Sequence, residues 1–323
     1  MTPTSRGSGN EIAVSVIVPA MNARETLPRA LEALAEQNLD AGYEVIVVDD
    51  GSDDDTAEVG ARAPGPVSVV AKPRGGPGSA RNRGVEAARG DVLAFTDADC
   101  FPAADWLREG LAAIERTDLV QGAVWPDPLA PRRPFDRSLW VTFDSGLYQT
   151  ANMFVRRSVF ERVGGFEDWL RPDSASHFGE DVVFAWRARR AGARAAFCER
   201  AVVRHAVFPR GPRGYLAERR RLAYFPALVR RAPELRRSFL YRRFFLSRRS
   251  AAFDLAVVGG ALAGVLASPL PLLAAVPYAW LLGRSASGWR RRAPVVAPVE
   301  LAGDAIGFGA LALGSLRNGR VVM

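Results

Sequence analysis

Short runs of β-branched apolar residues alternate with helix-like segments through the first two hundred residues of this chain. The runs are apolar on both faces, which is typical of a central parallel strand that is covered by helices on both sides. We expect strands at Val14–Pro19, Val45–Asp49, Val67–Ala71, Val92–Thr96, Leu119–Val124 and Asn152–Arg156, with one or two more within Arg194–Arg204. This alternation predicts an α/β domain built on a mostly parallel sheet with flanking helices.

The segments between these strands carry apolar residues at helical spacing. Leu27, Leu31 and Leu34 share one face of a helix that we expect to end at Gln37, with Thr26 as its N-cap. The stretch at 132–148 shows no clear period and is expected to be a loop or an irregular helix. Further helices are expected at Thr56–Arg62, Ser79–Arg89, Trp106–Arg116 and Val182–Ala191.

Charge and hydropathy change sharply after these elements. Between Arg204 and Arg249 there are fourteen arginines and two acids, whereas Phe253–Gly283 carries Asp254 as its one charge. A basic stretch beside an apolar one favours an anionic membrane surface over nucleic acid as the partner. Prolines divide the apolar stretch and arginines flank both ends, so we expect a hairpin that crosses the membrane an even number of times or dips into it. A buried helical pair used for dimerisation is the alternative.

These features divide the chain into four parts. We expect a disordered lead at 1–10, an α/β domain at 11–210, a basic juxtamembrane segment at 211–250 and apolar membrane-associated helices at 251–323. The lead is polar and lacks the apolar core of a signal peptide. Two cysteines are too few for a disulfide framework, which favours the cytoplasm. The apolar tail is interrupted by acids, as in a helix that lies on the membrane interface.

Acidic residues follow two of the predicted strands directly. Asp49 and Asp50 come at the end of the second strand, and Asp97 and Asp99 follow the fourth. Ligands of open α/β sheets bind outside the carboxyl ends of the strands, so these carboxylates are expected to face one crevice. Neither pair has a cation near it in the sequence, and such an uncompensated cluster is expected to hold a metal or a ligand. Two carboxylates on one turn suit Mg²⁺ or Mn²⁺.

At this point the chain resembles family 2 of the glycosyltransferases, which are inverting enzymes with the GT-A fold. The resemblance rests on VSVIVPAMN (14–22), EVIVVDDGSDDDT (44–56), GPGSARNRGVEAARGDVLAFTDADC (76–100) and GGFEDWL…GEDVVFAWRARRAG (164–192). It implies a nucleotide-sugar donor, with UDP- and GDP-sugars favoured, and a divalent metal, Mn²⁺ or Mg²⁺. A dinucleotide-binding oxidoreductase is disfavoured, because the glycines in 76–84 do not continue as GxGxxG.

The resemblance also implies which residues bind the donor nucleotide. They end or follow the first two strands, lie in the expected helix at Ser79–Arg89 or open the Asp-x-Asp turn: Pro19, Ala20, Asn22, Asp49, Asp50, Arg81, Asn82 and Asp97. A carboxylate is a good acceptor for a base N–H and for ribose hydroxyls, which suits a uracil or guanine nucleotide.

The metal ligands and the general base are also assigned from the resemblance. Asp99 is the expected direct metal ligand, and Asp97 reaches the metal or the ribose. His205 stands where related enzymes often place a histidine ligand, with a structural histidine as the alternative. The resemblance makes Asp181 the general base that an inverting displacement needs. Glu180 is the second choice for that base. The alternative is that both acids are not catalytic and only complement the dipole of the helix that they open.

Two departures from the family pattern bear on the reaction. Met21 stands where the family often has an aromatic residue, and the chain lacks the Gln-x-x-Arg-Trp motif of processive members, which favours transfer of single sugars. His177, in the loop before the acidic pair, is assigned to the acceptor loop or to solvent. We expect an enzyme that acts on a lipid-linked or envelope-glycan acceptor at the cytoplasmic face of the bacterial inner membrane. A non-catalytic binding module and a nucleotidyltransferase are the competing hypotheses.

Overall fold

The computed structural model describes residues 12–170 and 178–323, and these form two compact units. The first unit runs to Ala130 and resumes at Ser138–Val207, and the second combines Pro131–Arg137 with Phe208–Met323. The predicted lead at 1–10 and His177 lie outside the described residues.

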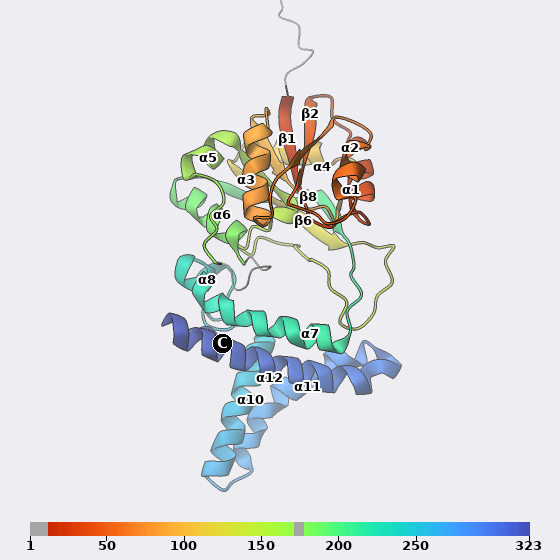
Figure 1. Ribbon diagram of the computed structural model, residues 1–323. Coiled ribbons are helices and arrows are strands. Elements are labelled where there is room, and N and C mark those ends of the chain that lie inside the picture. Colours follow the sequence, from red (N-terminus) through yellow and green to blue (C-terminus); the bar gives the residue numbers. More distant parts are fainter. Residues whose placement is uncertain (1–11, 171–177) are drawn as a thin grey trace, which may run out of the picture. The chain divides into compact units, whose positions relative to one another are not determined.

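The first unit is built on one eight-stranded sheet (Figure 1). Its strands lie in the order β3-β2-β1-β4-β7-β6-β8-β5. The first four in this order are mutually parallel, and β6 is parallel to β8, whereas β7 and β5 are antiparallel to their neighbours. The prediction of a mostly parallel sheet with flanking helices is therefore confirmed. The strands are β1 (Ile12–Ala20), β2 (Gly42–Asp49), β3 (Val67–Ala71), β4 (Val92–Phe95), β5 (Cys100–Pro102), β6 (Leu119–Pro126), β7 (Met153–Arg156) and β8 (Ala195–His205).

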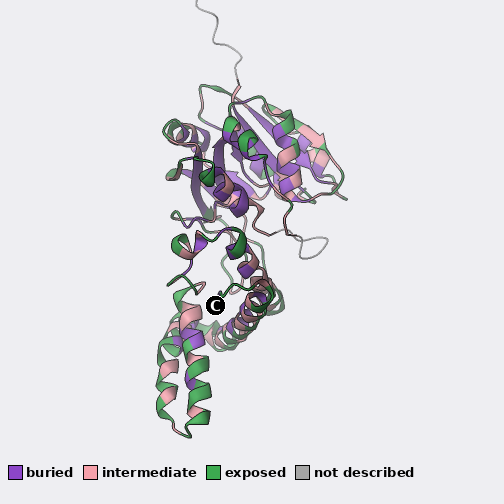
Figure 2. Cartoon of the chain, turned by 90° about the vertical axis from the view of Figure 1, so that its left-hand side faces the viewer, coloured by how far each residue is buried: buried purple, intermediate pink, exposed green. Residues whose placement is uncertain are grey.

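Helices cover both faces of this sheet, and the strands between them are buried (Figure 2). One face packs against α1 (Leu27–Ala35), α2 (Thr56–Ala61) and α4 (Trp106–Ile114), whose apolar side chains join those of β1, β2 and β4 in one core. The other face is covered by α3 (Pro77–Ala87), α5 (Arg157–Val163) and α6 (Glu180–Arg190). Four phenylalanine rings fill the space under these last two helices, namely Phe95, Phe160, Phe166 and Phe184.

Two local features differ from the sequence analysis. Thr26 is the N-cap residue of α1, as expected, but its side chain makes no capping hydrogen bond. Pro28 in the first turn has no N–H to donate, and the Thr26 hydroxyl lies 3.5 Å from the carbonyl oxygen of Ala23 instead. The three-residue strand β5 and the helix α5 were not predicted, because neither is long enough to show a period.

Asn152, at the end of the short 3₁₀ helix η1 (Thr150–Asn152), joins three elements of the core. Its side chain is fully buried. Its Oδ1 accepts a hydrogen bond of 2.8 Å from the Trp106 indole, and its Nδ2 donates to the carbonyl oxygens of Ala123 and Ala201, each at 2.8 Å. The side chain thus ties α4 to the paired strands β6 and β8.

We expect Asn152→Ala to lower the free energy of unfolding by about 3 kcal/mol, because three buried polar groups lose their partner at once. The urea midpoint of the purified protein measures this loss. Asn38→Ala is the matched control, since the Asn38 side chain is exposed, and its shift should stay within about 0.5 kcal/mol. Equal midpoints for the two variants would contradict the structural role of Asn152.

The second unit is helical. Its longest helix, α12 (Ala293–Asn318), packs on α7 (Pro212–Arg219) and on the 3₁₀ helix η2 (Arg220–Tyr224). Glycines allow this close approach, since a Cβ at Gly303 would lie 2.6 Å from the Tyr215 ring. The remaining elements are α8 (Phe225–Arg231), α9 (Leu235–Ser238), α10 (Arg248–Val265), η3 (Leu270–Ala275), α11 (Val276–Ser287) and η4 (Arg290–Arg292).

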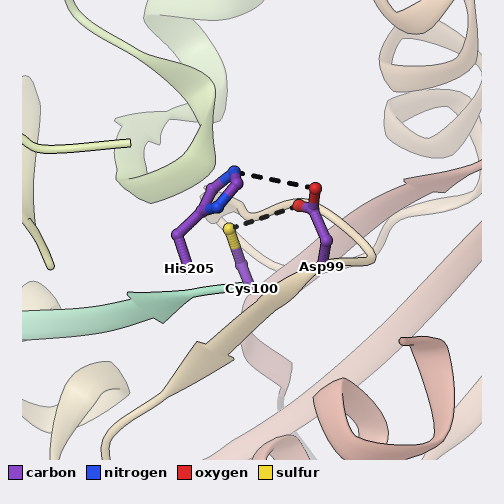
Figure 3. A group of neighbouring side chains, drawn as sticks. All are labelled: Asp99, Cys100 and His205. Carbon is purple, nitrogen blue, oxygen red and sulfur yellow. Dashed lines mark hydrogen bonds and ion pairs between the residues drawn. The ribbon is translucent and has the colours of Figure 1, made fainter. Parts of the chain in front are cut away.

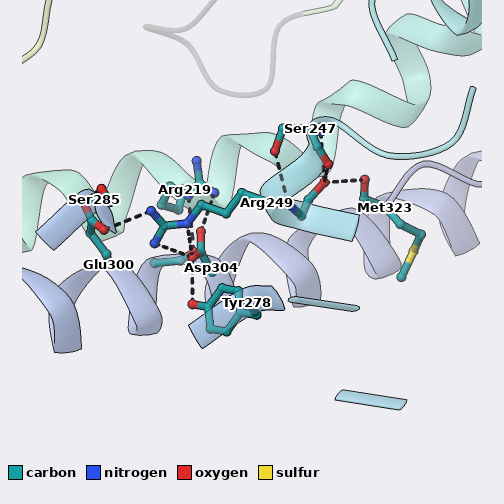
Figure 4. A network of polar contacts seen from close by, with 10 residues as sticks. Arg219, Ser247, Arg249, Tyr278, Ser285, Glu300, Asp304 and Met323 are labelled. Carbon is teal, nitrogen blue, oxygen red and sulfur yellow. Dashed lines mark hydrogen bonds and ion pairs between the residues drawn. The ribbon is translucent and has the colours of Figure 1, made fainter. Parts of the chain in front are cut away.

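A network of polar contacts joins four of these helices (Figure 4). Arg249 of α10 donates to Glu300 at 2.9 Å and to Asp304 at 2.7 Å, and both acids belong to α12. The Tyr278 hydroxyl of α11 donates to Asp304 at 2.9 Å, and Arg219 of α7 lies 3.4 Å from the same carboxylate. The two acids that interrupt the apolar tail are therefore compensated by arginines from other helices.

Candidate active site

The parallel strands of the first unit bring the predicted residues to one edge of the sheet. In the β1–β2 pair Ala20 stands opposite Asp49, and in the β1–β4 pair Ile17 stands opposite Phe95. The carboxyl ends of β1, β2 and β4 are therefore neighbours, and the chain continues from β4 into the turn that carries Asp97. The two acidic segments thus leave the sheet at the same edge, on either side of β1.

A hydrogen-bonded turn surrounds Asp49. The Asp49 carboxylate accepts a hydrogen bond from the Ser52 backbone N–H at 3.1 Å and another from the Ser52 hydroxyl. The Asn22 N–H donates to the same hydroxyl oxygen at 2.9 Å, and Asn22 Oδ1 accepts from the Asp53 N–H at 2.8 Å. The loops that follow β1 and β2 are therefore bound to each other, with Pro19 half-buried and Ala20 buried just before them.

Asp50 serves the loop before α3. Its buried carboxylate accepts from the N–H groups of Gly75 and Gly76 at 2.8 and 2.7 Å, and it lies 2.5 Å from Lys72 Nζ. Lys72, the one lysine of the chain, directly follows β3. The expectation that this acidic pair has no compensating cation was wrong, because the cation comes from the next strand rather than from the local sequence. Both oxygens of Asp50 are engaged in ordering this loop.

Arg81 links the Asp-x-Asp turn to the acidic pair of α6. Its side chain is almost fully buried, with Nη2 at 2.8 Å from Asp97 Oδ1 and Nη1 at 3.3 Å from Glu180 Oε1. The expectation of an uncompensated Asp97 was therefore also wrong. Three of the predicted residues, which are up to 99 positions apart, form one charged cluster.

Asn82 stands beside Arg81 on α3 but makes different contacts. Its Nδ2 donates to the Phe166 carbonyl oxygen at 2.9 Å, and its Oδ1 accepts from the Phe166 N–H at 2.9 Å. Gly164 and Gly165, in the turn before Phe166, both have positive φ angles, which glycine adopts without strain. In this structure the Asn82 amide holds that turn against α3, so it makes no contribution to the charged cluster among the described contacts.

Asp99 and His205 meet at the other end of the Asp-x-Asp turn (Figure 3). His205 Nε2 lies 3.6 Å from Asp99 Oδ2. The antiparallel pairing of β5 with β8 places Cys100 opposite His205, and the Ala206 N–H donates to the Asp99 carbonyl oxygen at 2.8 Å. Strand pairing therefore brings together two side chains that are 106 positions apart in the sequence.

The surroundings of His205 suit a metal ligand. Its Nδ1 lies 2.6 Å from the Ala206 carbonyl oxygen, which can only accept, so Nδ1 carries the proton. Nε2 is the ring nitrogen that faces Asp99, so it is the nitrogen that would bind a metal there. Cys100 Sγ is also close, but burial, Asp97 and Asp99 raise the pKa of this thiol well above its usual range. A protonated thiol is not a ligand for hard cations, so Asp99 and His205 form the candidate pair.

Asp181 stands in the first turn of α6, after Gly179. Its Oδ1 accepts from the Val182 N–H at 2.8 Å. Burial and the neighbouring charge of Glu180 raise the pKa of Asp181 to about 7, against the opposing effect of Arg81. A carboxylate with a pKa near neutrality is able to take up a proton at physiological pH.

A cavity of about 220 Å³ adjoins the charged cluster. The sequence analysis did not predict this cavity. The acidic pair after the Gly-Gly-Phe turn at 164–166 is the signal that could have found it, because Glu167 and Asp168 both line the cavity. The other lining residues are Gly75, Gly78, Ser79, Asn82, Phe166 and Glu180.

Comparisons with known proteins point to one family. Residues 15–166 match the family model described as glycosyl transferase family 2. The chain is 32% identical over 213 residues to the glycosyltransferase AglE of Haloferax volcanii, covering 61% of this chain and 68% of that protein. It is 34% identical over 204 residues to the succinoglycan biosynthesis protein ExoO of Rhizobium meliloti, covering 57% of each.

A solved structure is similar over almost the whole chain. The mannosyltransferase PcManGT of Pyrobaculum calidifontis, in complex with GDP-Man and Mn²⁺, aligns with a TM-score of 0.60. The alignment covers 97% of this chain and 89% of that one, at 21% sequence identity. At this identity the similarity establishes the fold.

Proposed function

The chain belongs to glycosyl transferase family 2, and from that membership we propose that it transfers a single sugar, with inversion, from a nucleotide-sugar donor to an acceptor hydroxyl in a metal-dependent reaction. One observation carries this proposal. The Asp-x-Asp turn is joined on one side to Glu180 of α6 through Arg81, and on the other side Asp99 lies 3.6 Å from His205 Nε2. The residues proposed as metal ligands and the acidic pair proposed to supply the base therefore lie around the same turn.

Asp99 and His205 are the residues that would hold the divalent metal. A carboxylate oxygen and an imidazole nitrogen form a mixed set that suits Mn²⁺ better than Mg²⁺, which prefers oxygen ligands. When bound, the metal supplies positive charge to the departing nucleoside diphosphate. The solved mannosyltransferase of the same fold is bound to Mn²⁺, which supports this choice.

Asp181 is the proposed general base. Glu180 already has one oxygen at 3.3 Å from the Arg81 guanidinium, so that oxygen is engaged in an ion pair. One oxygen of Asp181 accepts a hydrogen bond from the Val182 N–H, and burial and Glu180 raise the pKa of this carboxyl to about 7. It therefore accepts the proton of the acceptor hydroxyl as the sugar is transferred.

This pKa predicts the pH dependence of the reaction. Only the ionised Asp181 takes up the proton, so the rate at saturating donor should rise about tenfold per pH unit below about pH 7 and level off above it. Arg81 lowers the pKa of Asp181, so Arg81→Gln should move this acidic limb to higher pH. Initial rates of nucleotide release, measured across the pH range, give the position of the limb.

Arg83→Gln is the control for this shift, because Arg83 lies on the same helix and pairs with the exposed Glu86. Its pH profile should match that of the parent protein. An Arg81→Gln profile with the acidic limb unmoved would exclude Asp181 as the group that titrates.

The donor is proposed to be a UDP- or GDP-sugar. Asp49 and Asn22 line the edge at which β1 and β2 end, and a carboxylate there accepts well from the ring N–H of uracil or guanine. Pro19 and Ala20 contribute the adjoining backbone. A GDP-sugar in the similar mannosyltransferase structure supports this class of donor.

The acceptor is proposed to be lipid-linked or part of an envelope glycan, at the cytoplasmic face of the inner membrane. Its test is transfer of radiolabelled sugar to a lipid extract, followed by partition into organic solvent. Label that enters the organic phase only with active protein and metal supports a lipid-linked acceptor. Label that is transferred only to water-soluble glycans would exclude it, while leaving the reaction itself unchanged.

A further inference from the structure

The second unit carries a hairpin with uncovered apolar side chains. It consists of α10, η3 and α11. Among residues 12–170 and 178–323, 23 large hydrophobic side chains are exposed, and eleven of them fall between Leu255 and Trp280. Exposed residues line both arms of this hairpin (Figure 2). An apolar surface of this density marks a site of interaction.

The two arms already pack against each other. A Cβ at Gly259 of α10 would lie 2.5 Å from the Pro271 carbonyl oxygen and 2.7 Å from Ala274 Cβ, so only glycine permits this approach. The Phe253 and Tyr278 rings meet edge to face, with centroids 5.0 Å apart. The exposed side chains therefore point away from a completed hairpin, and no described part of this unit covers them.

We propose that this hairpin enters the lipid bilayer from one side and returns without crossing it, while α12 lies in the plane of the membrane surface. The whole of α10 has 18 residues and is about 27 Å long. A bilayer core is about 30 Å thick, and the first turn of α10 carries Arg248 and Arg249. The uncharged part of α10, which begins at Leu255, is too short to span the core but long enough to pass beyond one leaflet.

Charge identifies the bilayer as the occupant. The arms carry no charge from Leu255 to Gly283, whereas Arg248 and Arg249 precede them and Arg284 follows. Both ends of the hairpin are thus basic and its tip is apolar. This pattern matches an apolar interior beneath anionic headgroups. An interface with a second copy of the chain would not require arginines at both ends of the hairpin.

The helix at 290–318, which contains α12, is the one in the described chain that is long and apolar enough to cross a membrane. Its contacts oppose a crossing. Asp304 is held by Arg249 and Arg219, and a Cβ at Gly307 would lie 3.1 Å from the Leu222 side chain of η2. A crossing α12 would have to take the arginine-rich α7 and η2 into the hydrocarbon, which is costly. In Figure 1 the hairpin projects away from α12 and does not run along it.

Two glycines provide matched probes for the test. Nothing lies within 4 Å of the position that a Cβ would take at Gly264, near the tip of the hairpin, or at Gly309, within α12. Gly264→Cys and Gly309→Cys are made in the full chain with Cys100 and Cys198 replaced by alanine, and each is labelled with a fluorophore. The labelled proteins bind vesicles of phosphatidylcholine and phosphatidylglycerol that carry nitroxide groups at a shallow or a deep position.

We expect the deep nitroxide to quench the probe at 264 and the shallow one to quench the probe at 309. The opposite pattern, with 309 deep and 264 in water, would overturn the proposal in favour of a spanning α12. Two unquenched probes in a dimeric protein would overturn it in favour of a subunit interface. The inference rests on the proposed action at a membrane, but its test uses no sugar nucleotide, so it can fail without the proposed reaction failing.

A charge at the tip provides a second test. Leu270 in the hairpin and Leu129 in the first unit are 71% and 83% exposed, so glutamate at either position leaves the core intact. Leu270→Glu should weaken vesicle binding about tenfold or more, because the charge would enter the hydrocarbon. Leu129→Glu should leave binding unchanged. Equal binding by the two variants would contradict insertion of the hairpin.

Discussion

Replacing Asp181 by asparagine should lower kcat by about a thousandfold, with little change in the KM for the donor. A positioned general base contributes roughly 10²- to 10⁴-fold to such a reaction, and an amide cannot take up the proton. The amide side chain in Asp181→Asn would keep an oxygen for the Val182 N–H, so the start of α6 should hold its conformation. Rates of sugar transfer at saturating donor and acceptor measure the effect.

Asp91→Asn is the matched control, because Asp91 is exposed and lies before β4, away from the charged cluster. It should retain the activity of the parent protein. Glu180→Gln separates the two candidate bases. If Asp181→Asn turns over normally and Glu180→Gln does not, the assignment of the base is reversed. If both turn over normally, neither acid is the base.

Replacing Asp99 by asparagine should weaken Mn²⁺ binding and lower kcat/KM by about a thousandfold. A bound metal contributes several kcal/mol to stabilising charge in the transition state, and each 1.36 kcal/mol changes the rate tenfold. The backbone carbonyl of residue 99 still accepts from the Ala206 N–H, so β5 and β8 should stay paired. The signal of free Mn²⁺ in electron paramagnetic resonance, with nucleoside diphosphate present, measures the binding.

His205→Ala should weaken Mn²⁺ binding in the same assay, since Nε2 is the second proposed ligand. Asp40→Asn, at an exposed position before β2, is the control and should bind Mn²⁺ as the parent does. Parent-like Mn²⁺ binding by both site variants would remove Asp99 and His205 from the metal site. Loss in Asp99→Asn alone would return His205 to a structural role.

Local sequence patterns were sufficient for the central strands of the sheet and for the position of its acidic edge. The β-branched runs predicted β1, β2 and β4, because a strand buried on both faces has little choice of residues. Asp49 and Asp97 could be assigned to a common edge, since the carboxyl ends of parallel strands always meet. Their place directly after two such strands was enough for that inference, without any knowledge of side-chain contacts.

The partners of these acids could not be predicted from local sequence patterns. Lys72 and Arg81 compensate Asp50 and Asp97, yet each lies at least 16 positions from its acid, so inspection of the neighbouring residues could not identify them. The contact of Asp99 with His205 depends on the pairing of β5 with β8, and β5 is too short to predict. Such contacts depend on which strands pair, and the hydrophobic pattern of a single segment does not reveal its partner strand.

The metal-dependent use of a nucleotide sugar is tested most directly by a donor screen. The full-length protein is incubated with UDP-, GDP-, dTDP- and CMP-sugars, with Mn²⁺ or Mg²⁺ and a lipid extract as the source of acceptor, and released nucleotide is measured. We expect release from a UDP- or GDP-sugar that is lost with a chelator and in Asp99→Asn. Release that is equal in the presence of chelator and in Asp99→Asn, or no release from any donor by folded protein, would contradict this account.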